Sequence, residues 1–230
     1  KKEFPEGELF LVGGAVRDII LGREPVVDFD FVVRNVAAKD VGDFLKEHGK
    51  VNLVGKKFGV FKFVGKLASL KEPIDVALPR TEAAVKKTGA HRDFKIASDH
   101  ELPITADLAR RDFTINAMAW DILHGKLIDP FGGIVDLLKK KLDTVGLPSR
   151  RFSEDLARIL RAIRFSCELG VAIEPRVWSS IRRLVPKINA KMNPRAHGGA
   201  GGEWIVPREV LAKELLKSFL ANPVKAFDLS

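Results

Sequence analysis

The first half of the chain alternates short apolar runs with segments of helical periodicity. Strands are predicted for "ELFLV", "VNLVG", "GVFKFVG" and "PIDVAL", which are short apolar runs punctuated by glycine or proline. Helices are predicted for "AVRDIILG", closed by Gly22, and for "AKDVGDFLKEHG", where Val41, Phe44 and Leu45 share one face. "VNLVG" and "GVFKFVG" stand too close for a helical crossover, so antiparallel pairs are expected. The patterns predict an α/β (α+β) domain with a small mixed sheet.

One further predicted strand, "VVDFDFVV" at Val26–Val33, carries two negative charges. Because side chains alternate between the faces of a strand, Asp28 and Asp30 would share one face and lie a few Å apart. No Lys or Arg lies within the run to neutralise them. The run by itself leaves two interpretations open, a solvated strand edge or a Mg²⁺ site that relieves the repulsion.

Helical periodicity takes over after Phe152. The stretch "FSEDLARILRAIRFSCELG" predicts one amphipathic helix capped by Ser153. Its predicted buried face holds Leu156, Ile159, Leu160 and Ile163, and its opposite face holds Glu154, Arg158 and Arg161. "PRVWSSIRRLVPKINAK" and "VPREVLAKELLKSFLANP" predict further helices. The second half is therefore expected to be all-α, with the domain boundary between residues 148 and 149, beside the Gly and Pro of "GLPSRR".

Two segments between these halves have less regular patterns. Residues 81–102 are charged and show no sustained period, so a mobile loop is expected there. "ITADLARRDFTINAMAWDI" is predicted to be helical, followed by a strand and turn in "GKLIDPFGG". In that helix Asp112 and Asn116 would share one face at a spacing of four residues.

Composition narrows the class of protein. The 230 residues are 46% hydrophobic and 30% charged, which is typical of a packed globular protein. No apolar run approaches the roughly 20 residues of a membrane-spanning helix, and the N-terminus lacks the apolar region of a signal peptide. A single cysteine, Cys167, excludes an internal disulfide and fits a reducing compartment, so a cytoplasmic protein is expected. The net charge of +9 favours nucleic acid as a partner, although an ordinary basic surface gives the same number.

Candidate anion contacts surround the carboxylate pair in the sequence. In "LVGGAVRD" a strand, a Gly-Gly turn and a helix start would present backbone N–H groups to an anion. The missing Cβ atoms of Gly13 and Gly14 allow close approach, and Arg17 lies in the first turn. Further on, Arg111 suits phosphate, and Asp112 could accept a ribose hydroxyl.

Four motifs in order resemble one known family. They are "LVGGAVRD", "DFDFVV", "DLARRDFTINAMA" with "DPFGG", and "EDLARILRAIRF", spread over Leu9–Phe165. Together they resemble the class II tRNA nucleotidyltransferases (CCA-adding enzymes) and the bacterial poly(A) polymerases. The resemblance implies a nucleotidyltransferase head of the polymerase-β type over residues 1–148. It also implies a helical neck, with the start of a body domain, over 149–230, and a chain that stops before the rest of body and tail.

The resemblance also implies roles for individual residues. The metal-binding carboxylates are Asp28 and Asp30, with Mg²⁺ as the cofactor. The implied nucleotide contacts are Gly14 and Arg17 with phosphate, Arg111 and Asp112 with phosphate and ribose, Asp155 and Arg158 with the incoming base, and Arg161 and Arg164 near the nucleotide. Asp75 in "PIDVAL" is a candidate third carboxylate.

The expected activity is template-independent addition of CMP or AMP to the 3′ end of tRNA, with ATP or CTP as donor. Within the family, full CCA addition, CC-only addition, A-only addition and poly(A) synthesis stay open. A rival from another class is a non-catalytic RNA-binding module. Such a module has no use for paired carboxylates near a polyanion.

Overall fold

The computed structural model describes residues 2–23, 28–54, 60–66, 73–84, 94–191, 202 and 204–229. Contacts within the chain define two compact units. A sheet unit comprises Lys1–Glu82, Ile96–Arg111 and Ile115–Gly133, and a helical unit comprises Ala83–Lys95, Asp112–Thr114 and Ile134–Ser230. The main change between units falls at Gly133–Ile134, earlier in the chain than the domain boundary expected at 148/149, which stays a prediction.

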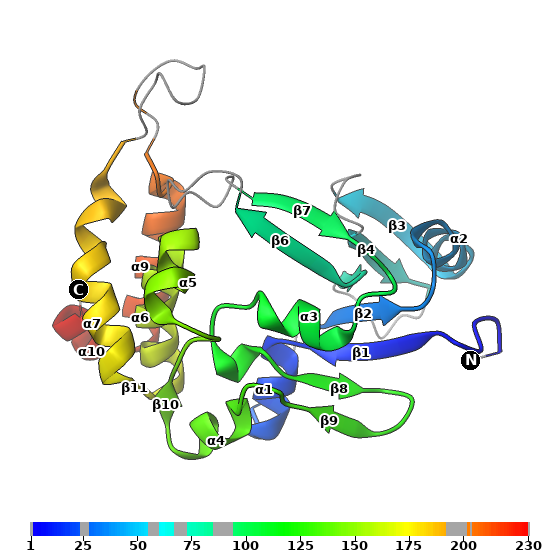
Figure 1. Ribbon diagram of the computed structural model, residues 1–230, viewed down its shortest axis with the longest axis horizontal. Coiled ribbons are helices and arrows are strands. Elements are labelled where there is room, and N and C mark those ends of the chain that lie inside the picture. Colours follow the sequence, from blue (N-terminus) through cyan, green and yellow to red (C-terminus); the bar gives the residue numbers. More distant parts are fainter. Residues whose placement is uncertain are drawn as a thin grey trace. The chain divides into compact units, whose positions relative to one another are not determined.

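A seven-stranded mixed sheet organises the sheet unit (Figure 1). The strand order is β3-β4-β5-β2-β1-β8-β9. β2 and β5 run parallel, and the other neighbouring strands of this sheet run antiparallel, as predicted for the "VNLVG"–"GVFKFVG" pair. The strands are β1 (Glu8–Val12), β2 (Asp30–Arg34), β3 (Gly49–Val54), β4 (Val60–Gly65), β5 (Ile74–Ala77), β8 (Ala119–Asp121) and β9 (Lys126–Ile128).

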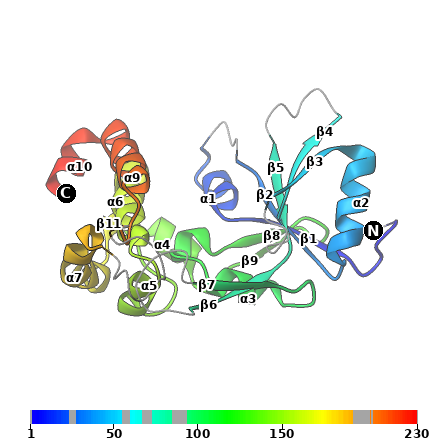
Figure 2. The same ribbon diagram turned by 90° about the horizontal axis from the view of Figure 1, so that it is seen from above.

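Helix α2 closes the core on one side of the sheet. The helices of this part of the chain are α1 (Gly14–Ile20), α2 (Ala38–His48), α3 (Ile104–Ala109) and the 3₁₀ turn η2 (Thr114–Asn116). Val41 and Leu45 of α2 are buried in one cluster with Phe61 and Val76, and Phe44 packs against it. Figure 2 shows α2 beside β3 and β4. The predicted apolar face of this helix is confirmed.

β2 begins later than the pattern predicted. The first two residues of the run Val26–Val33 lie outside the described residues, and Asp28 and Phe29 precede the strand, which starts at Asp30. The rings of Phe29 and Phe31 nevertheless stack, with centroids 6.5 Å apart, as expected for alternate residues of an extended chain. The two carboxylates therefore stand at and just before the first residue of the strand.

Part of the segment expected as a mobile loop is a β-hairpin. β6 (Arg80–Ala84) and β7 (Phe94–Ser98) form a separate two-stranded sheet. The residues between them, 85–93, lie outside the described residues. The loop prediction was wrong at both strands because "RTEAA" and "FKIAS" are only five residues long, too short for a sustained period to show.

The helix predicted for "ITADLARRDFTINAMAWDI" was wrong beyond Ala109. The chain leaves α3 there, forms η2 and enters β8 at Ala119. Phe113, Ile115 and Met118 are all fully buried. A helix presents only one stripe to a core, so burial of almost every residue from 112 to 119 requires an irregular path.

The helical unit contains helices and one small parallel sheet. Its elements are α4 (Gly133–Leu138), β10 (Lys141–Leu142), α5 (Pro148–Glu154), α6 (Ala157–Leu169), β11 (Ala172–Ile173), α7 (Pro175–Leu184), the 3₁₀ helix η3 (Val185–Asn189), α9 (Arg208–Ala221) and α10 (Pro223–Leu229). Strands β10 and β11 pair in parallel, so the expectation of a purely helical second half was wrong in this detail. α6 packs against α9 and α10 (Figure 1), where Ile163, Cys167 and Ala226 form a buried cluster.

A break at Asp155 divides the single helix predicted after Phe152. α5 ends at Glu154, Asp155 is extended, and α6 starts at Ala157, so Ser153 is not a cap. Asp155 performs that task instead, since its Oδ1 accepts the backbone N–H of Ala157 at 2.9 Å. The predicted buried face is confirmed at Leu156, Ile159, Leu160 and Ile163. Arg158 was placed wrongly on the exposed face, because it is 7% exposed.

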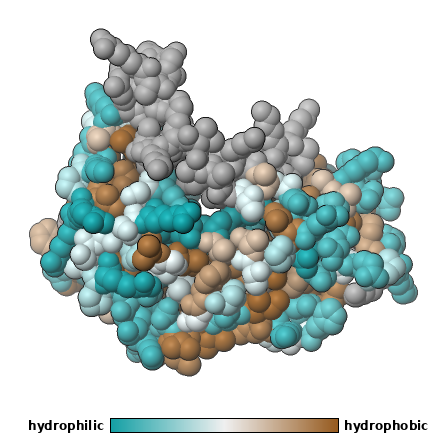
Figure 3. All heavy atoms as spheres, in the orientation of Figure 1, coloured by the Kyte–Doolittle hydropathy of each residue, from teal (hydrophilic) through white to brown (hydrophobic). Residues whose placement is uncertain are grey.

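The surface carries scattered apolar residues. Val135 and Leu138 of α4 are 49% and 78% exposed, and Figure 3 shows hydrophobic residues along the lower edge of the view, where Figure 1 places α4. Among the helices that the structure describes, none combines the length and the apolar character that crossing a membrane requires.

The β3–β4 hairpin supplies a test of the sheet. A Cβ at Gly49 would lie 2.2 Å from the carbonyl oxygen of Val64 on the paired strand, so Gly49→Ala must push two backbones apart. We expect a loss of about 1–3 kcal/mol in the free energy of unfolding, measured by urea titration. Lys50→Ala, at the exposed neighbour, should cost far less. Equal stability of the two variants would contradict this packing.

Candidate functional site

The glycine turn after β1 is closed by the protein's own backbone. Gly13 has φ +75°, a conformation that favours glycine, and its N–H donates to the carbonyl oxygen of Met118 at 3.3 Å. That N–H is therefore engaged, whereas the sequence interpretation offered it to an anion. The missing Cβ of Gly13 leaves room for the side chain of Arg111, because a Cβ there would lie 2.7 Å from Nη1 of Arg111.

Arg111 is held against this turn in the sheet unit. Its Nη1 donates to the carbonyl oxygen of Asn116 at 3.3 Å, and its Nη2 to Oδ2 of Asp107 at 3.3 Å. Its Nε is buried and has no hydrogen-bond partner among the described residues. Buried donors are rarely left unpaired, so this orphaned N–H is a mark of a ligand-binding position.

A buried carboxylate, Asp107, organises the two adjacent arginines. Asp107 is 0% exposed and lies in α3. Its Oδ1 accepts from Nη2 of Arg110 at 2.7 Å and from the backbone N–H of Arg80 at 3.3 Å, in addition to the Arg111 bond. Burial by itself would raise the pKa of Asp107, but the charges of Arg111 and Arg110 outweigh it and lower the pKa.

Sequence reasoning missed Asp107. The spacing could have revealed it, because Arg110 and Arg111 lie three and four residues after it on a short helix.

The carboxylates of β2 gather with those of its parallel neighbour. Asp30 is in register with Asp75 of β5, and Asp75 accepts a hydrogen bond from Nζ of Lys62 at 2.9 Å. Asp28 and Asp30 are exposed. Desolvation raises the pKa of Asp30 most, and the charges of Asp75 and Asp28 raise it further, against the opposing charges of Arg111 and Lys62. The negative charge at this strand end is thus only partly compensated by the protein.

This strand end fits a hard cation that is shared with a substrate. Within the described ranges, no group of three or more His, Cys, Asp or Glu side chains is arranged to hold a metal ion by itself. Two carboxylates, with the pKa of Asp30 raised by desolvation and by neighbouring negative charge, leave the remaining ligands to water or phosphate, as is usual for Mg²⁺. Asp75 is a weaker candidate for a third ligand because Lys62 holds it.

Arg17 and Asn116 are brought together in the sheet unit. Nη1 of Arg17 donates to Oδ1 of Asn116 at 2.7 Å, and its Nε and Nη2 donate to Asp18 at 2.9 and 2.8 Å. Arg17 is 8% exposed. The predicted pairing of Asn116 with Asp112 on one helical face is wrong, because Asp112 belongs to the helical unit and Asn116 to the sheet unit.

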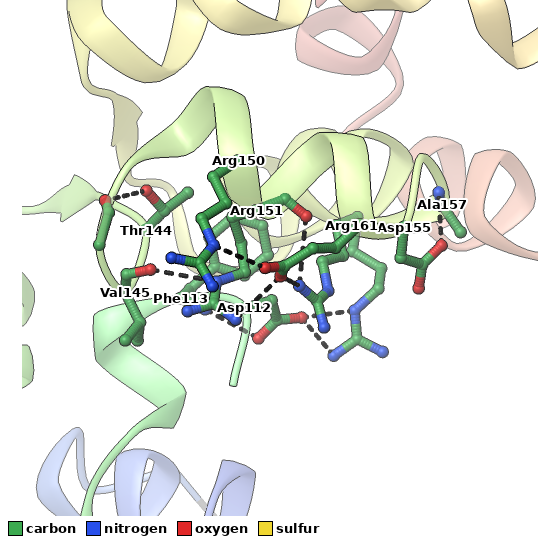
Figure 4. Close-up of polar contacts among 12 residues, drawn as sticks. Asp112, Phe113, Thr144, Val145, Arg150, Arg151, Asp155, Ala157 and Arg161 are labelled. Carbon is green, nitrogen blue, oxygen red and sulfur yellow. Dashed lines mark hydrogen bonds and ion pairs between the residues drawn. The ribbon is translucent and has the colours of Figure 1, made fainter. Parts of the chain in front are cut away.

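Asp112 pairs with Arg161 of α6 (Figure 4). Nε of Arg161 donates to Oδ2 of Asp112 at 2.7 Å, and Oδ1 of Asp112 accepts the backbone N–H of Phe113 at 2.9 Å. Burial would raise the pKa of Asp112, but the charges of Arg161 and Arg158 outweigh it and lower the pKa. This partly buried ion pair fixes Asp112 to α6 within the helical unit.

A second ion-pair network lies across the α5–α6 break (Figure 4). Oε2 of Glu154 accepts from Nη1 of Arg158 at 3.0 Å and from Nη1 of Arg151 at 3.1 Å. Nη1 of Arg158 also donates to the carbonyl oxygen of Arg151 at 3.2 Å. Glu154 therefore orients Arg158, a role that the sequence analysis did not assign to it.

Arg164 is engaged in structural contacts. Its Nε donates to Oε2 of Glu214 in α9 at 2.6 Å, its Nη1 donates to Oε2 of Glu168 at 2.9 Å, and its guanidinium lies 4.1 Å from the ring centroid of Phe165. These contacts tie α6 to α9.

Comparisons with known protein sequences match the chain to a poly A polymerase family and to CCA-adding proteins. Residues 9–143 match the model of the family described as the poly A polymerase head domain. The chain is 39% identical over 222 residues to the multifunctional CCA protein of Xylella fastidiosa, a match covering 95% of this chain and 46% of that protein. It is 34% identical over 189 residues to the CCA-adding enzyme of Geobacillus stearothermophilus, covering 78% and 41%.

Solved structures of CCA-adding enzymes also match this chain. The Bacillus stearothermophilus CCA-adding enzyme in complex with CTP matches with a TM-score of 0.74 and 31% identity, covering 97% of this chain and 47% of that one. The Thermotoga maritima CCA-adding enzyme complexed with tRNA matches with a TM-score of 0.69 and 29% identity, covering 96% and 45%. The chain spans about half the length of the relatives that it matches.

The buried hub at Asp107 yields a stability prediction. Asp107→Asn leaves Arg110 and Arg111 without their counter-charge and should lower the free energy of unfolding by about 3 kcal/mol at pH 7. A carboxyl with a lowered folded-state pKa stabilises the fold above its unfolded pKa of about 4, and this contribution is lost as the pH falls through the folded value. The difference between wild type and variant should therefore shrink below about pH 4.

Urea unfolding across pH measures this difference. Asp43→Asn, which removes the exposed partner of Lys46, is the control and should change stability little. If Asp107→Asn were as stable as the wild type at pH 7, the hub would carry no net stabilisation.

Proposed function

The chain belongs to the family of the poly(A) polymerase head domain, and on that premise we propose that it is the catalytic part of a template-independent RNA nucleotidyltransferase acting on the 3′ end of tRNA. The proposed reaction is attack of the RNA 3′-hydroxyl on the α-phosphate of ATP or CTP, with release of pyrophosphate. The observation that carries the proposal is the under-compensated pair Asp28 and Asp30 beside Arg111. CTP and tRNA in the solved structures of the two relatives support the choice of substrates.

The proposed cofactor is Mg²⁺, held by Asp28 and Asp30. When bound, the ion lowers the pKa of the attacking hydroxyl and neutralises charge on the phosphates. Arg111, whose Nη1 lies in the space that the missing Cβ of Gly13 leaves, offers its unpartnered Nε–H and its positive charge to a phosphate. Catalysis then consists mainly of positioning and electrostatic stabilisation.

The proposed nucleotide contacts follow the resemblance. Gly14 and Arg17 contact phosphate, and Asp112 accepts a ribose hydroxyl. Nε and Nη2 of Arg161 and the backbone N–H of Phe113 occupy three of the about four acceptor positions of the ionised carboxylate, so one is left for a hydroxyl. We assign Asn116 to the same region, through its bond to Arg17.

The proposed base contacts are Asp155 and Arg158. A carboxylate and a guanidinium three residues apart offer an acceptor and a donor edge to a nucleobase. Glu154 holds the guanidinium of Arg158 at 3.0 Å, which restricts the directions in which it can donate. Arg161 and Arg164 would add positive charge to this part of the helical unit. Residues 1–148 are the proposed catalytic domain, and 149–230 the proposed neck and start of the body, in a protein of the cytoplasm, where tRNA is processed.

The alternative within the family is a poly(A) polymerase, which the name of the matching family model favours. The rival outside it is a binding module without chemistry. Incubation with tRNA that ends at its discriminator base, or that already carries CC, together with labelled CTP or ATP, separates CCA, CC-only, A-only and poly(A) products. For the binding module, no product forms, and Mg²⁺ with ATP leaves the melting temperature unchanged.

The carboxylate pair gives a direct test of catalysis. Asp28→Ala should abolish incorporation, because one of two metal ligands is lost, while the melting temperature without nucleotide stays close to wild type. Asp43→Ala removes the same charge from an exposed site on α2 and should keep full activity. Incorporation that persists in Asp28→Ala would refute the proposed chemistry.

The glycine turn gives a test of phosphate binding. In Gly13→Ala the new Cβ displaces Arg111, so KM for the nucleotide should rise on the order of tenfold, the cost of one charge-assisted hydrogen bond. Gly22→Ala is the matched control, because Gly22 also has a positive φ (+63°) but has open space around its Cβ position. Steady-state kinetics in both variants separates the strain they share from the loss of Arg111. A similar KM for the nucleotide in both variants would show that Arg111 does not contact the nucleotide.

A further inference from the structure

The positive charge of the chain is concentrated in one stretch of the helical unit. Between residues 175 and 202 the sequence has six Lys or Arg residues and no Asp or Glu. That excess of six is two thirds of the net charge of +9 carried by all 230 residues. None of these six belongs to the residues assigned to nucleotide or metal, so the proposed function leaves this charge unexplained.

The structure places four of these cations along one continuous segment. Arg182 and Arg183 lie near the end of α7, Lys187 lies in η3, and Lys191 pairs through an isolated β-bridge with Trp204. We call these four residues the basic strip. Arg182, Arg183, Lys187 and Lys191 are all exposed. Figure 3 shows mainly hydrophilic residues along the left edge of the view, where Figure 1 places α7.

The buried side of α7 fixes which way the strip faces. Val177, Ile181 and Leu184 are at most 5% exposed and anchor the helix in the helical unit. Arg182 and Arg183 follow Ile181 directly and therefore point away from this apolar stripe. The strip is held in place by the core beneath it.

The charges of the strip are not neutralised by the protein. Among the described residues, no ion pair joins any of the four cations to a carboxylate, whereas Arg176, at the start of the same helix, binds Asp143 at 2.7 Å. Two of the four rest on aromatic rings instead. Arg182 lies 5.6 Å from the ring centroid of Trp178, and Lys191 lies 4.9 Å from that of Trp204. Ring contacts orient a cation while leaving its full charge for a partner.

From this arrangement we propose that the basic strip is a docking surface for the sugar–phosphate backbone of the RNA substrate, separate from the residues assigned to the nucleotide. Successive cations without interspersed acids suit a linear polyanion, through release of its counterions. The two tryptophan rings already contact cations of the strip, Trp178 with Arg182 and Trp204 with Lys191. The strip therefore contacts the sugar–phosphate backbone and not the bases. Its binding to the RNA does not depend on which nucleotide is added.

The identity of the RNA as tRNA rests on the proposed function, but the surface does not. Binding of a fluorescein-labelled tRNA transcript to the 230-residue chain, followed by anisotropy over a range of salt concentrations, tests it. Arg182→Ala/Arg183→Ala/Lys187→Ala should weaken binding on the order of tenfold at low salt. It should also reduce the salt slope by about three, one for each lost phosphate contact.

The matched control removes three charges elsewhere in the helical unit. Lys139→Ala/Lys213→Ala/Lys217→Ala changes three exposed lysines on and beside α4 and on α9. It should leave the slope near that of wild type. Both triple variants should retain the wild-type shift in melting temperature with Mg²⁺ and ATP, because neither touches the residues assigned to the nucleotide.

Three results would overturn the inference. They are an unchanged salt slope in the strip variant, an equal loss in the control, and tighter strip-dependent binding to phosphatidylserine vesicles than to tRNA. A wild-type chain that binds tRNA through the strip but incorporates no nucleotide would leave the docking surface standing and refute the proposed function instead.

Discussion

Negative charge held close together at the start of β2 is the constraint on which the sheet unit depends. Asp28, Asp30 and Asp75 are brought together by the parallel pairing of β2 with β5, and desolvation together with the charges of Asp75 and Asp28 raises the pKa of Asp30. Among the described residues, Lys62 and Arg111 are the cations that oppose this rise. Lys62 bonds to Asp75 and is supplied by the next strand, so the sheet itself delivers that counter-charge.

Arg111 is held in place by contacts from other parts of the sheet unit. Asp107 anchors its guanidinium beside Gly13: this fully buried carboxylate accepts one hydrogen bond from Arg111, two from Arg110 and one from the backbone N–H of Arg80. The same carboxylate bonds the first residue of β6, so the position of Arg111 and the start of the hairpin share one anchor. Removing an anchor of this kind leaves charges unpaired in a region of low dielectric, which is why such hubs are costly to break.

In the helical unit, carboxylates likewise orient arginines at the α5–α6 break. A continuous helix would have placed Glu154, Asp155 and Arg158 along one exposed surface. The break instead makes Asp155 a cap, leaves Glu154 as the partner of Arg158 and Arg151, and buries Arg158. Asp112 and Arg161 form a further, partly buried ion pair in the same unit. Each arginine is therefore oriented by a carboxylate on a neighbouring turn or segment, which limits the entropy lost when a ligand binds.

The sequence by itself determined the strands β1, β4 and β5, the helices α1 and α2, the buried stripe of α6 and the candidate residues, because these depend on period and on local residue chemistry. It could not determine the order of the seven strands, which is a matter of pairings distant in sequence. The hairpin β6–β7 was decided by the pairing of its two strands, and in the irregular path from Arg110 to Met118 and the break at Asp155 burial and capping outweighed local periodicity. The roles of Asp107 and Glu154 were decided there as well: a carboxylate becomes an anchor only when the fold removes it from water and surrounds it with specific donors.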